Sequence, residues 1–361
     1  MNRSRETNPF AGRLASFAAK LRKRGIAAAL VHGEANQKGL VGFGCDNGCL
    51  RVAADGKAAF HTDFRYIPAA KREAPWLDVR DMACLRAADV RRPRGRKFRI
   101  GYEGGIAASR YLALKRMFRG AELVDVGGDL LLLRAVKTPD EIARVRAAVA
   151  LNDRIWREVS REIRPGLTEK EIQRMIRARM NDLGDGEAFE TIVCVGANAA
   201  ECHHVPDGTV WRRGEPLLVD MGVKLGGYCS DMTRCIGGAG RRRGAGRSRY
   251  GEIYGLVLSA NLAAIAAAKP GISGKRLDAV AREIIRKAGY GRKFGHALGH
   301  GVGIEIHEQP VASKRSDTKL KPGMLVTIEP GVYIESELGV RIEDLVLITE
   351  SGCEVLTASP K

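Results

Sequence analysis

Two aspartates occur in adjacent apolar runs near the middle of the chain. PLLVDMGVKL contains Asp220, and GYCSDMTRCI, which follows directly, contains Asp231. The junction Gly226-Gly227 favours a two-residue hairpin turn, which pairs residue 220 with 233 and makes the two aspartates diagonal neighbours on one face. Buried carboxylates repel each other unless a cation lies between them. The pair therefore predicts a divalent-cation site, and the alternative is two solvated hairpin aspartates.

Three histidines fall within twelve residues of the run FGHALGHGVGIEIHEQP, namely His296, His300 and His307. The small residues around His300 let backbone and ligands approach closely, and a neutral imidazole is a common metal ligand. We expect His300 to bind a cation and the other two histidines to orient or protonate a substrate. The alternative is that they are packed core histidines.

Two glutamates interrupt apolar runs near the end of the chain. VTIEPGVYI places Glu329 in a strand-like run before Pro-Gly, and GVRIEDLVLIT places Glu343 in another, with Arg341 on the same side by the two-residue period of a strand. Acids in such runs are rarely buried unless they are paired. Each could pair with a base, but four acids and a histidine-rich glycine loop together predict a metal centre for a hard or borderline divalent cation.

The residues before this cluster alternate helix and strand patterns. The expected elements are a helix over 9–24, a strand over 26–33, a hairpin over 49–63 around Asp55-Gly56, a helix beginning in 64–74, a strand over 98–105 and a helix over 109–120. We expect an α/β N-terminal domain over residues 1–135.

The remainder, residues 136–361, is expected to form an α+β domain with an antiparallel sheet. Thr138 before Pro139 begins one helix, and Thr168 with Glu171 three residues on forms the capping box of a second helix over 167–184. Two more helices are expected over 249–268 and 275–288. The predicted strands are ETIVCVG, PLLVDMGVKL, GYCSDMTRCI, GMLVTIEPGVYI and VRIEDLVLIT.

The composition is that of a globular protein. The chain has 361 residues, 45% hydrophobic and 28% charged, enough for two domains at about 100–200 residues each. MNRSRETNPF lacks the apolar run of a signal peptide, no run of about 18 apolar residues predicts a membrane span, and 256–268 is expected to be a buried helix. Eight cysteines without C-x-x-C spacing are expected to be reduced thiols in a cytoplasmic protein.

The formal net charge is +18, and two basic runs stand out, RRPRGRKFR (91–99) and RRRGAGRSR (241–249). Neither is interleaved with the aromatic residues that stack on nucleic-acid bases. We interpret both runs as solvated loops. The alternative is an anionic partner such as nucleic acid, for which salt-dependent binding is the test.

These motifs resemble the pita-bread metallopeptidases, the family of methionine aminopeptidase, aminopeptidase P and prolidase. The resemblance implies five metal ligands, which are Asp220 in VDMG, Asp231 in SDMTR, His300 in GHGVG, Glu329 in IEPG and Glu343 in VRIED. The family's H-x-x-P element matches His203, with His204 beside it as the other candidate. Its second substrate histidine, in HE-x-P, matches His307. The implied fold of the second domain is a pita-bread fold with a curved antiparallel sheet.

The resemblance also implies a mechanism. Two divalent cations, manganese first with cobalt, zinc or iron as alternatives, activate a water molecule, Asp231 and Glu343 bridge the two cations, and Glu329 shuttles a proton. His203 and His307 donate hydrogen bonds to the substrate carbonyl oxygen. His296 and Arg341 contact the substrate or support the site, and Thr233 and Tyr228 are further supporting candidates.

The first third resembles the creatinase-type N-terminal domain in NQKGLVGF, HTDFRYIPAA and IGYEGG. This favours the proline-specific branch, with an Xaa-Pro peptide as substrate, a homodimer and no membrane. Three alternatives stay open: a methionine-type aminopeptidase, a creatinase, which lacks this ligand set, and a non-catalytic binding protein on the same scaffold. The sequence does not separate aminopeptidase P from prolidase.

Overall fold

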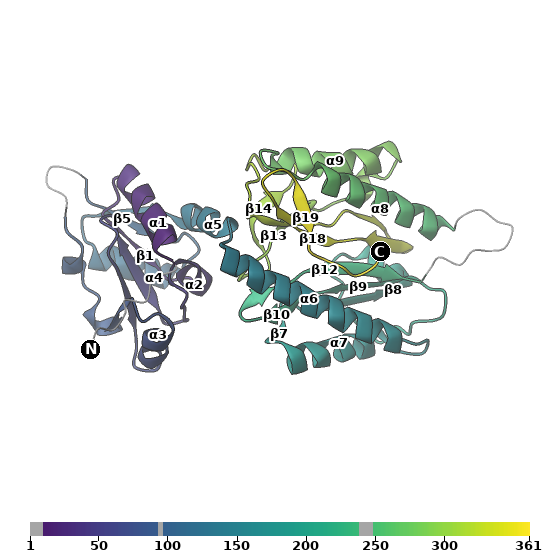
Figure 1. Ribbon diagram of the computed structural model, residues 1–361, viewed down its shortest axis with the longest axis horizontal. Coiled ribbons are helices and arrows are strands. Elements are labelled where there is room, and N and C mark those ends of the chain that lie inside the picture. Colours follow the sequence, from purple (N-terminus) through teal and green to yellow (C-terminus); the bar gives the residue numbers. More distant parts are fainter. Residues whose placement is uncertain (1–9, 93–96, 238–247) are drawn as a thin grey trace. The chain divides into compact units, whose positions relative to one another are not determined.

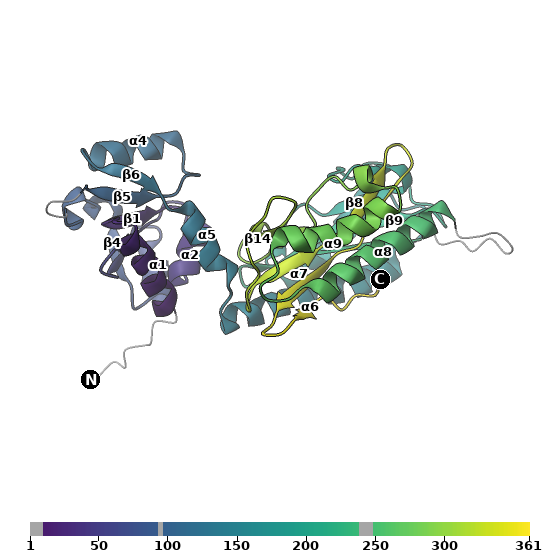
Figure 2. The ribbon, with the colours of Figure 1, turned by 90° about the horizontal axis from the view of Figure 1, so that it is seen from above.

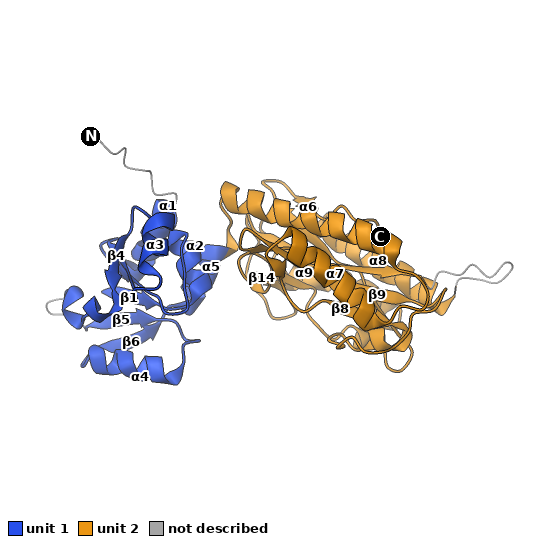
Figure 3. Ribbon diagram, turned by 90° about the horizontal axis from the view of Figure 1, so that it is seen from below, with its two compact units in different colours: residues 1–134 blue, residues 135–361 orange. Residues whose placement is uncertain are grey.

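The structure is a computed structural model that describes residues 10–92, 97–237 and 248–361. It divides into two compact units, residues 1–134 and 135–361 (Figure 3). Residues 93–96 and 238–247 are not described, so the basic run 91–99 lies partly, and the run 241–249 largely, outside the described residues. The interpretation of 241–249 therefore stays a prediction.

Unit 1 is a six-stranded mixed sheet with strand order β4-β3-β2-β1-β5-β6 (Figure 1). Its strands are β1 Ala28–Val31, β2 Cys49–Ala53, β3 Ala58–Thr62, β4 Asp78–Asp81, β5 Arg99–Tyr102 and β6 Glu122–Asp125. Its helices are α1 Ala11–Lys23, α2 Glu34–Val41, α3 Ile67–Glu73, α4 Ala108–Met117 and α5 Gly127–Ala135, which reaches the first residue of unit 2. The predicted hairpin is confirmed, with Gly56 at φ 92° in its turn.

Both faces of this sheet are covered, as the strand periodicity requires. In β1, Ala29 and Val31 face a core shared with α1 and α2, whereas Ala28 and Leu30 face a core shared with α4. Such alternation places successive side chains on opposite faces. The expected α/β architecture is thus present in unit 1.

The first half of unit 2 packs two helices, α6 Pro139–Glu162 and α7 Glu169–Leu183, on short antiparallel strands. The predicted capping box at Thr168 forms, and the predicted cap Thr138 forms one as well: each threonine accepts from the backbone N–H of the glutamate three residues on, which reaches back to the threonine N–H. The strands are β7 Gly186–Glu187, β8 Ile192–Val195, β9 Leu217–Met221, β10 Val223–Leu225, β11 Tyr228–Cys229 and β12 Met232–Ile236.

The second half packs α8 Arg249–Ala267 and α9 Gly274–Lys287 on the remaining strands. Those strands are β13 Gly299–Gly301, β14 Glu308–Ala312, β15 Leu325–Ile328, β16 Gly331–Ile334, β17 Leu338–Arg341, β18 Asp344–Ile348 and β19 Cys353–Val355. Figures 1 and 2 show α6 and α7 on one side of the strands of unit 2 and α8 and α9 on the other. All strand pairs of this unit are antiparallel, as expected.

Helix α8 is long and apolar enough to cross a bilayer, the one such helix among the described residues. It instead contributes Ile253, Val257, Ala260 and Ala264 to the core. Its buried Asn261 donates to the backbone oxygen of Ile328, 2.9 Å away. One face of the helix is therefore buried, as predicted for this segment, whereas Leu262 is 51% exposed.

The central hairpin has the predicted register, with Thr233 opposite Asp220 and Leu225 opposite Tyr228. Gly226 and Gly227 have φ of 58° and 77°, the positive values that a type I′ turn requires at both central residues. The strand predicted in ETIVCVG is confirmed as β8, but the four longer strand predictions need correction. Each long apolar run is broken, so that Asp231, Glu329 and Glu343 lie between strands and not inside them.

Candidate metal centre

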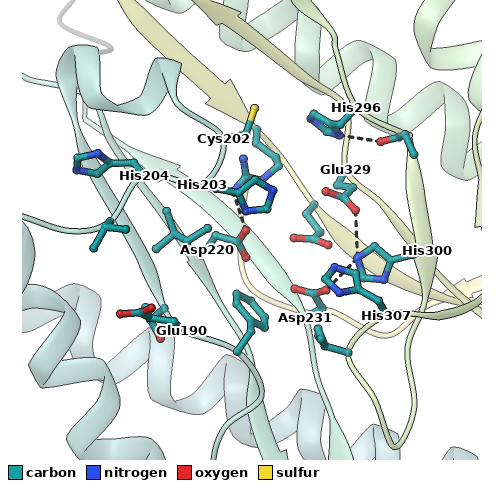
Figure 4. A pocket seen from close by; sticks show the side chains of 18 of the residues that line it. Glu190, Cys202, His203, His204, Asp220, Asp231, His296, His300, His307 and Glu329 are labelled. Atoms are coloured by element: carbon teal, nitrogen blue, oxygen red, sulfur yellow. Dashed lines mark hydrogen bonds and ion pairs between the residues drawn. The ribbon is translucent and has the colours of Figure 1, made fainter. Parts of the chain in front are cut away.

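A cavity of about 460 Å³ in unit 2 gathers nine of the side chains that the sequence singles out (Figure 4). They are His203, Asp220, Asp231, His296, His300, His307, Glu329, Arg341 and Glu343. They come from segments of both halves of the unit, and the breaks in the strands turn the acids toward a common centre.

The acids form a tight cluster around one imidazole. Ligand atoms of Asp231, His300 and Glu343 all lie within 4.8 Å of one another. His300 Nε2 is 3.5 Å from Asp231 Oδ2 and 3.3 Å from Glu329 Oε1. The Thr327 hydroxyl, which also accepts from the backbone N–H of His300, donates to Glu329 Oε1 at 3.0 Å. These groups can therefore reach one small ion together.

Burial and mutual repulsion shift the cluster toward its neutral forms. Burial, and then the charges of neighbouring carboxylates, raise the pKa of Asp231 and of Glu343 well above their usual values. Burial raises the pKa of Glu329 to about 8. Such carboxylates are ionised together only when positive charge compensates them, so the cluster fits a cation better than it fits an empty core.

Two further observations fit the same conclusion. Asp220 Oδ1 is buried and has no hydrogen-bond partner among the described residues. His300 Nδ1 is 3.0 Å from the backbone oxygen of Gly301, and since a carbonyl only accepts, Nδ1 carries the proton and the Nε2 lone pair faces the acids. Burial lowers the His300 pKa, which keeps the ring neutral. Metal-binding histidines characteristically donate their other N–H to such a group.

Arg341 holds the opposite side of the cluster. Its Nη2 donates to Asp220 Oδ2 at 2.6 Å, its Nε to the Thr233 hydroxyl at 3.0 Å and its Nη1 to the Tyr333 hydroxyl at 2.9 Å. Thr233 in turn donates to Glu343 Oε2 at 2.7 Å. Arg341 therefore supports the acids through protein contacts. The Tyr228 hydroxyl donates to a different acid, Glu141.

The histidines divide into two kinds. His203 and His307 are exposed residues that line the cavity, and the rings of His300 and His307 meet edge to face with centroids 4.4 Å apart. His296 is enclosed, with Nδ1 2.7 Å from the backbone oxygen of Ala297 and Nε2 2.8 Å from the Tyr333 hydroxyl. Both of its nitrogens are thus engaged with protein groups.

The sequence reasoning missed several residues that line the cavity or hydrogen-bond to the side chains that do. Thr327 lies two residues before Glu329, so the strand period would have placed it on the same face. Cys202 adjoins His203 in the sequence, and Tyr333 follows Glu329 by four residues. The apolar part of the wall, which is Phe189, Ile192 and Ile306, carries no sequence signal beyond its hydrophobicity.

A buried group of carboxylates around one imidazole, opening into a cavity beside exposed histidines, defines a metallohydrolase-type site on a two-unit scaffold. Residues 143–350 match metallopeptidase family M24, and residues 13–136 match the creatinase/prolidase N-terminal domain. The chain belongs to metallopeptidase family M24 and is an enzyme of that class.

Known relatives are similar in sequence over most of the chain. An Xaa-Pro dipeptidase of Pyrococcus furiosus is 39% identical over 263 residues, which cover 73% of this chain and 74% of the relative. An uncharacterized peptidase of Bacillus subtilis is 35% identical over 342 residues, 93% of this chain and 95% of the relative.

Solved structures of similar proteins have the same fold over nearly the whole chain. An Xaa-Pro dipeptidase from Bacillus anthracis has a TM-score of 0.88 at 33% identity and covers 98% of each chain. An X-Pro aminopeptidase from Thermotoga maritima has a TM-score of 0.83 at 31% identity, covering 96% of this chain and 98% of its own. The predicted fold, an α/β N-terminal domain followed by a pita-bread domain, is confirmed by these matches.

Proposed function

We propose that this metallopeptidase uses two divalent cations to hydrolyse the peptide bond that precedes proline. The observation that carries the proposal is the convergence of Asp220, Asp231, Glu329 and Glu343 with the Nε2 atom of His300 in one cavity. Four acids and one imidazole suit hard or borderline cations. Manganese is the first candidate, with cobalt, zinc and iron as alternatives.

The five ligands are assigned from the positions of their side chains at the cavity. Asp220, Asp231, His300, Glu329 and Glu343 would hold the cations. A bound cation pair lowers the pKa of water and polarises a carbonyl group. The buried Oδ1 of Asp220, which lacks a protein partner among the described residues, supports this assignment.

The other side chains would act on the substrate directly. Glu329 borders the cavity, where a hydrogen bond from Thr327 fixes its Oε1, and it would take a proton from water and pass it toward the leaving nitrogen. His203 and His307, exposed at the cavity, would donate hydrogen bonds to the carbonyl oxygen as negative charge develops there. His296 and Arg341 would form the wall that supports these groups.

The specificity rests on shape. The amide before proline has no N–H, so a site cannot recognise one and must fit the ring. Phe189, Ile192 and Ile306 give the cavity an apolar part. The relatives named as Xaa-Pro dipeptidase and X-Pro aminopeptidase support this substrate class. The homodimer and the cytoplasmic location stay predictions.

The test is turnover together with metal analysis. The purified chain, loaded in turn with manganese, cobalt, zinc or iron, is assayed on Xaa-Pro dipeptides, on longer peptides with proline second, and on Met-Xaa peptides lacking proline. We expect two metals per chain and cleavage before proline only. Preference for Met-Xaa would establish the methionine-type alternative. Absence of any turnover, combined with salt-dependent nucleic-acid binding, would favour the binding-protein alternative.

A further inference from the structure

Glu169, the first residue of α7, is completely buried and is not among the described residues that line the cavity. Its carboxylate accepts four hydrogen bonds. Oε1 accepts from the Val195 N–H at 2.6 Å and from Asn198 Nδ2 at 2.9 Å. Oε2 accepts from His204 Nε2 at 2.7 Å and from the Asp207 N–H at 3.0 Å.

These four donors bracket one segment, residues 195–207, which carries Cys202 and His203 into the cavity. One oxygen holds the beginning of the segment and the other holds its end. A single buried carboxylate therefore closes this segment into a loop. Hydrogen bonds to a charged acceptor are about twice as strong as neutral ones, so the closure is tight.

The same segment is fixed from its other side by β17. A Cβ atom added to Gly339 would lie 1.7 Å from the backbone oxygen of Ala199, so the two backbones meet without a side chain between them. Strand β17 ends at Arg341. The loop is thus held between the start of α7 and strand β17, the strand that carries Arg341 to the acid cluster.

Glu169, His204 and Asp207 lie close enough together to suggest a second metal site. The contacts of Glu169 argue otherwise. An ionised carboxylate offers about four lone-pair positions, and four N–H donors already occupy them. The cluster is an anchor made of hydrogen bonds.

We infer that Glu169 and His204 are positioning residues for His203. Figure 4 shows His204 directed away from the acid cluster, and its neighbour His203 is an exposed residue of the cavity wall. Because the two histidines are adjacent, fixing the His204 ring on Glu169 sets the direction of the His203 ring. This inference rests on the proposed function for the role of His203, but the anchor itself is independent of it.

The decisive variants are His204→Ala, which removes the donor to Glu169, and His204→Gln, whose side-chain amide can restore it. Glu169→Gln is the reciprocal change, since its NH₂ group cannot accept from His204 or Asp207. Glu171→Gln is the matched control on the same helix, because Gln also completes a capping box.

We expect His204→Ala and Glu169→Gln to lower kcat about 10- to 100-fold, as misplacement of a catalytic group does, with unchanged metal content.

A second measurement needs no substrate. The rate at which a thiol reagent labels Cys202, followed by peptide mass mapping, reports opening of the 195–207 loop. We expect faster labelling in His204→Ala and Glu169→Gln, a return toward the wild-type rate in His204→Gln, and no change in Glu171→Gln.

Wild-type labelling rates and wild-type kcat in both His204→Ala and Glu169→Gln would overturn the inference, and so would equal effects in Glu171→Gln. Faster labelling with no peptidase activity in the wild-type chain would instead retain the anchor and reject the proposed function. Because His204 is partly exposed, its variants keep the test available if Glu169→Gln does not fold.

Discussion

Arg341 and Asp220 form an ion pair at the edge of the acid cluster, with 2.6 Å between Nη2 and Oδ2 and only 4% and 13% of their side chains exposed. Arg341 is the one arginine or lysine among the described residues that line the cavity. It contributes the fixed positive charge of the site, and any further compensation of the acids has to come from bound cations.

Arg341→Met is expected to destabilise the metal-free protein by about 3–5 kcal/mol, because it leaves Asp220 buried without its partner. Saturating manganese should reduce that loss, since cations bound at the acids replace part of the missing charge. Urea unfolding with chelator and with manganese measures the difference. Lys137→Met, which breaks a buried ion pair with Glu308, is the control and should lose the same stability in both conditions. An equal loss for Arg341→Met in both would contradict the expectation.

Asp231→Asn and Glu343→Gln are expected to abolish metal loading. Both acids are buried, at 5% and 1% exposure, so the neutral amides remove charge without opening the fold. Metal content after desalting, measured by mass spectrometry, is the observable. Glu190→Gln, at an exposed acid that also lines the cavity, should retain wild-type loading. Full metal content in either buried variant would remove it from the ligand set.

His307→Ala is expected to keep the metal content and the melting temperature but to lose about 10²- to 10³-fold in kcat, the effect of removing one donor to a developing oxyanion. The ring packs edge to face on His300, so metal analysis must accompany the kinetics. Unchanged turnover would leave His307 without a catalytic role.

The sequence predicts those parts of the site that depend on residues close together in the chain, such as turn glycines and helix caps. Gly226 and Gly227 determine the hairpin register that pairs Asp220 with Thr233, because only glycine readily takes positive φ at both turn positions. Thr138 and Thr168 start α6 and α7 for an equally local reason. The ligand candidates likewise stood out as acids inside apolar runs.

The breaks beside Asp231 and Glu343 had no local signal, because an apolar run looks the same whether or not its strand is interrupted, whereas the break at Glu329 had one in the Pro-Gly pair that follows it. They arise from contacts distant in sequence. The N–H of Glu329 bonds the Leu298 oxygen, and the N–H of Glu343 bonds the Thr233 oxygen. Helix α2 was missed for a different reason: Gly33 at its N-cap provides no side-chain cap.

His296 is expected to titrate near pH 4 and not near its usual 6.5, because burial, then the charge of Arg341, lowers its pKa. It also faces Arg282, His203 and the Tyr333 hydroxyl. As the pH falls, His296 binds a proton in the unfolded chain before it does so in the folded protein. The contribution of the neutral His296 ring to the free energy of unfolding is therefore complete above pH 6.5 and is lost as the pH falls toward 4. The whole effect is about 3 kcal/mol.

The histidine resonances in an NMR titration measure this pKa directly. Unfolding of His296→Gln between pH 7 and 4 provides the control, because the variant should lose less stability than the wild type over that range. A His296 pKa near 6.5 would show that the ring is more open to solvent than its contacts with Ala297 and Tyr333 imply.

The ion pair between Lys137 and Glu308 joins the start of α6 to the residue after His307, with 3.1 Å between Nζ and Oε2 and 2% of each side chain exposed. Lys137→Met should cost about 3–5 kcal/mol, because Glu308 keeps its buried charge and loses its partner. Combining it with Glu308→Leu should cost less than Lys137→Met alone, since the charge is then gone as well. Urea unfolding of the wild type, both single variants and the double variant gives the coupling energy. Strictly additive losses would mean that the two residues act through packing and not through charge. A coupled pair would also predict a lower kcat in Lys137→Met, because Glu308, whose Oε1 accepts from the Glu305 N–H, shapes the turn that presents His307.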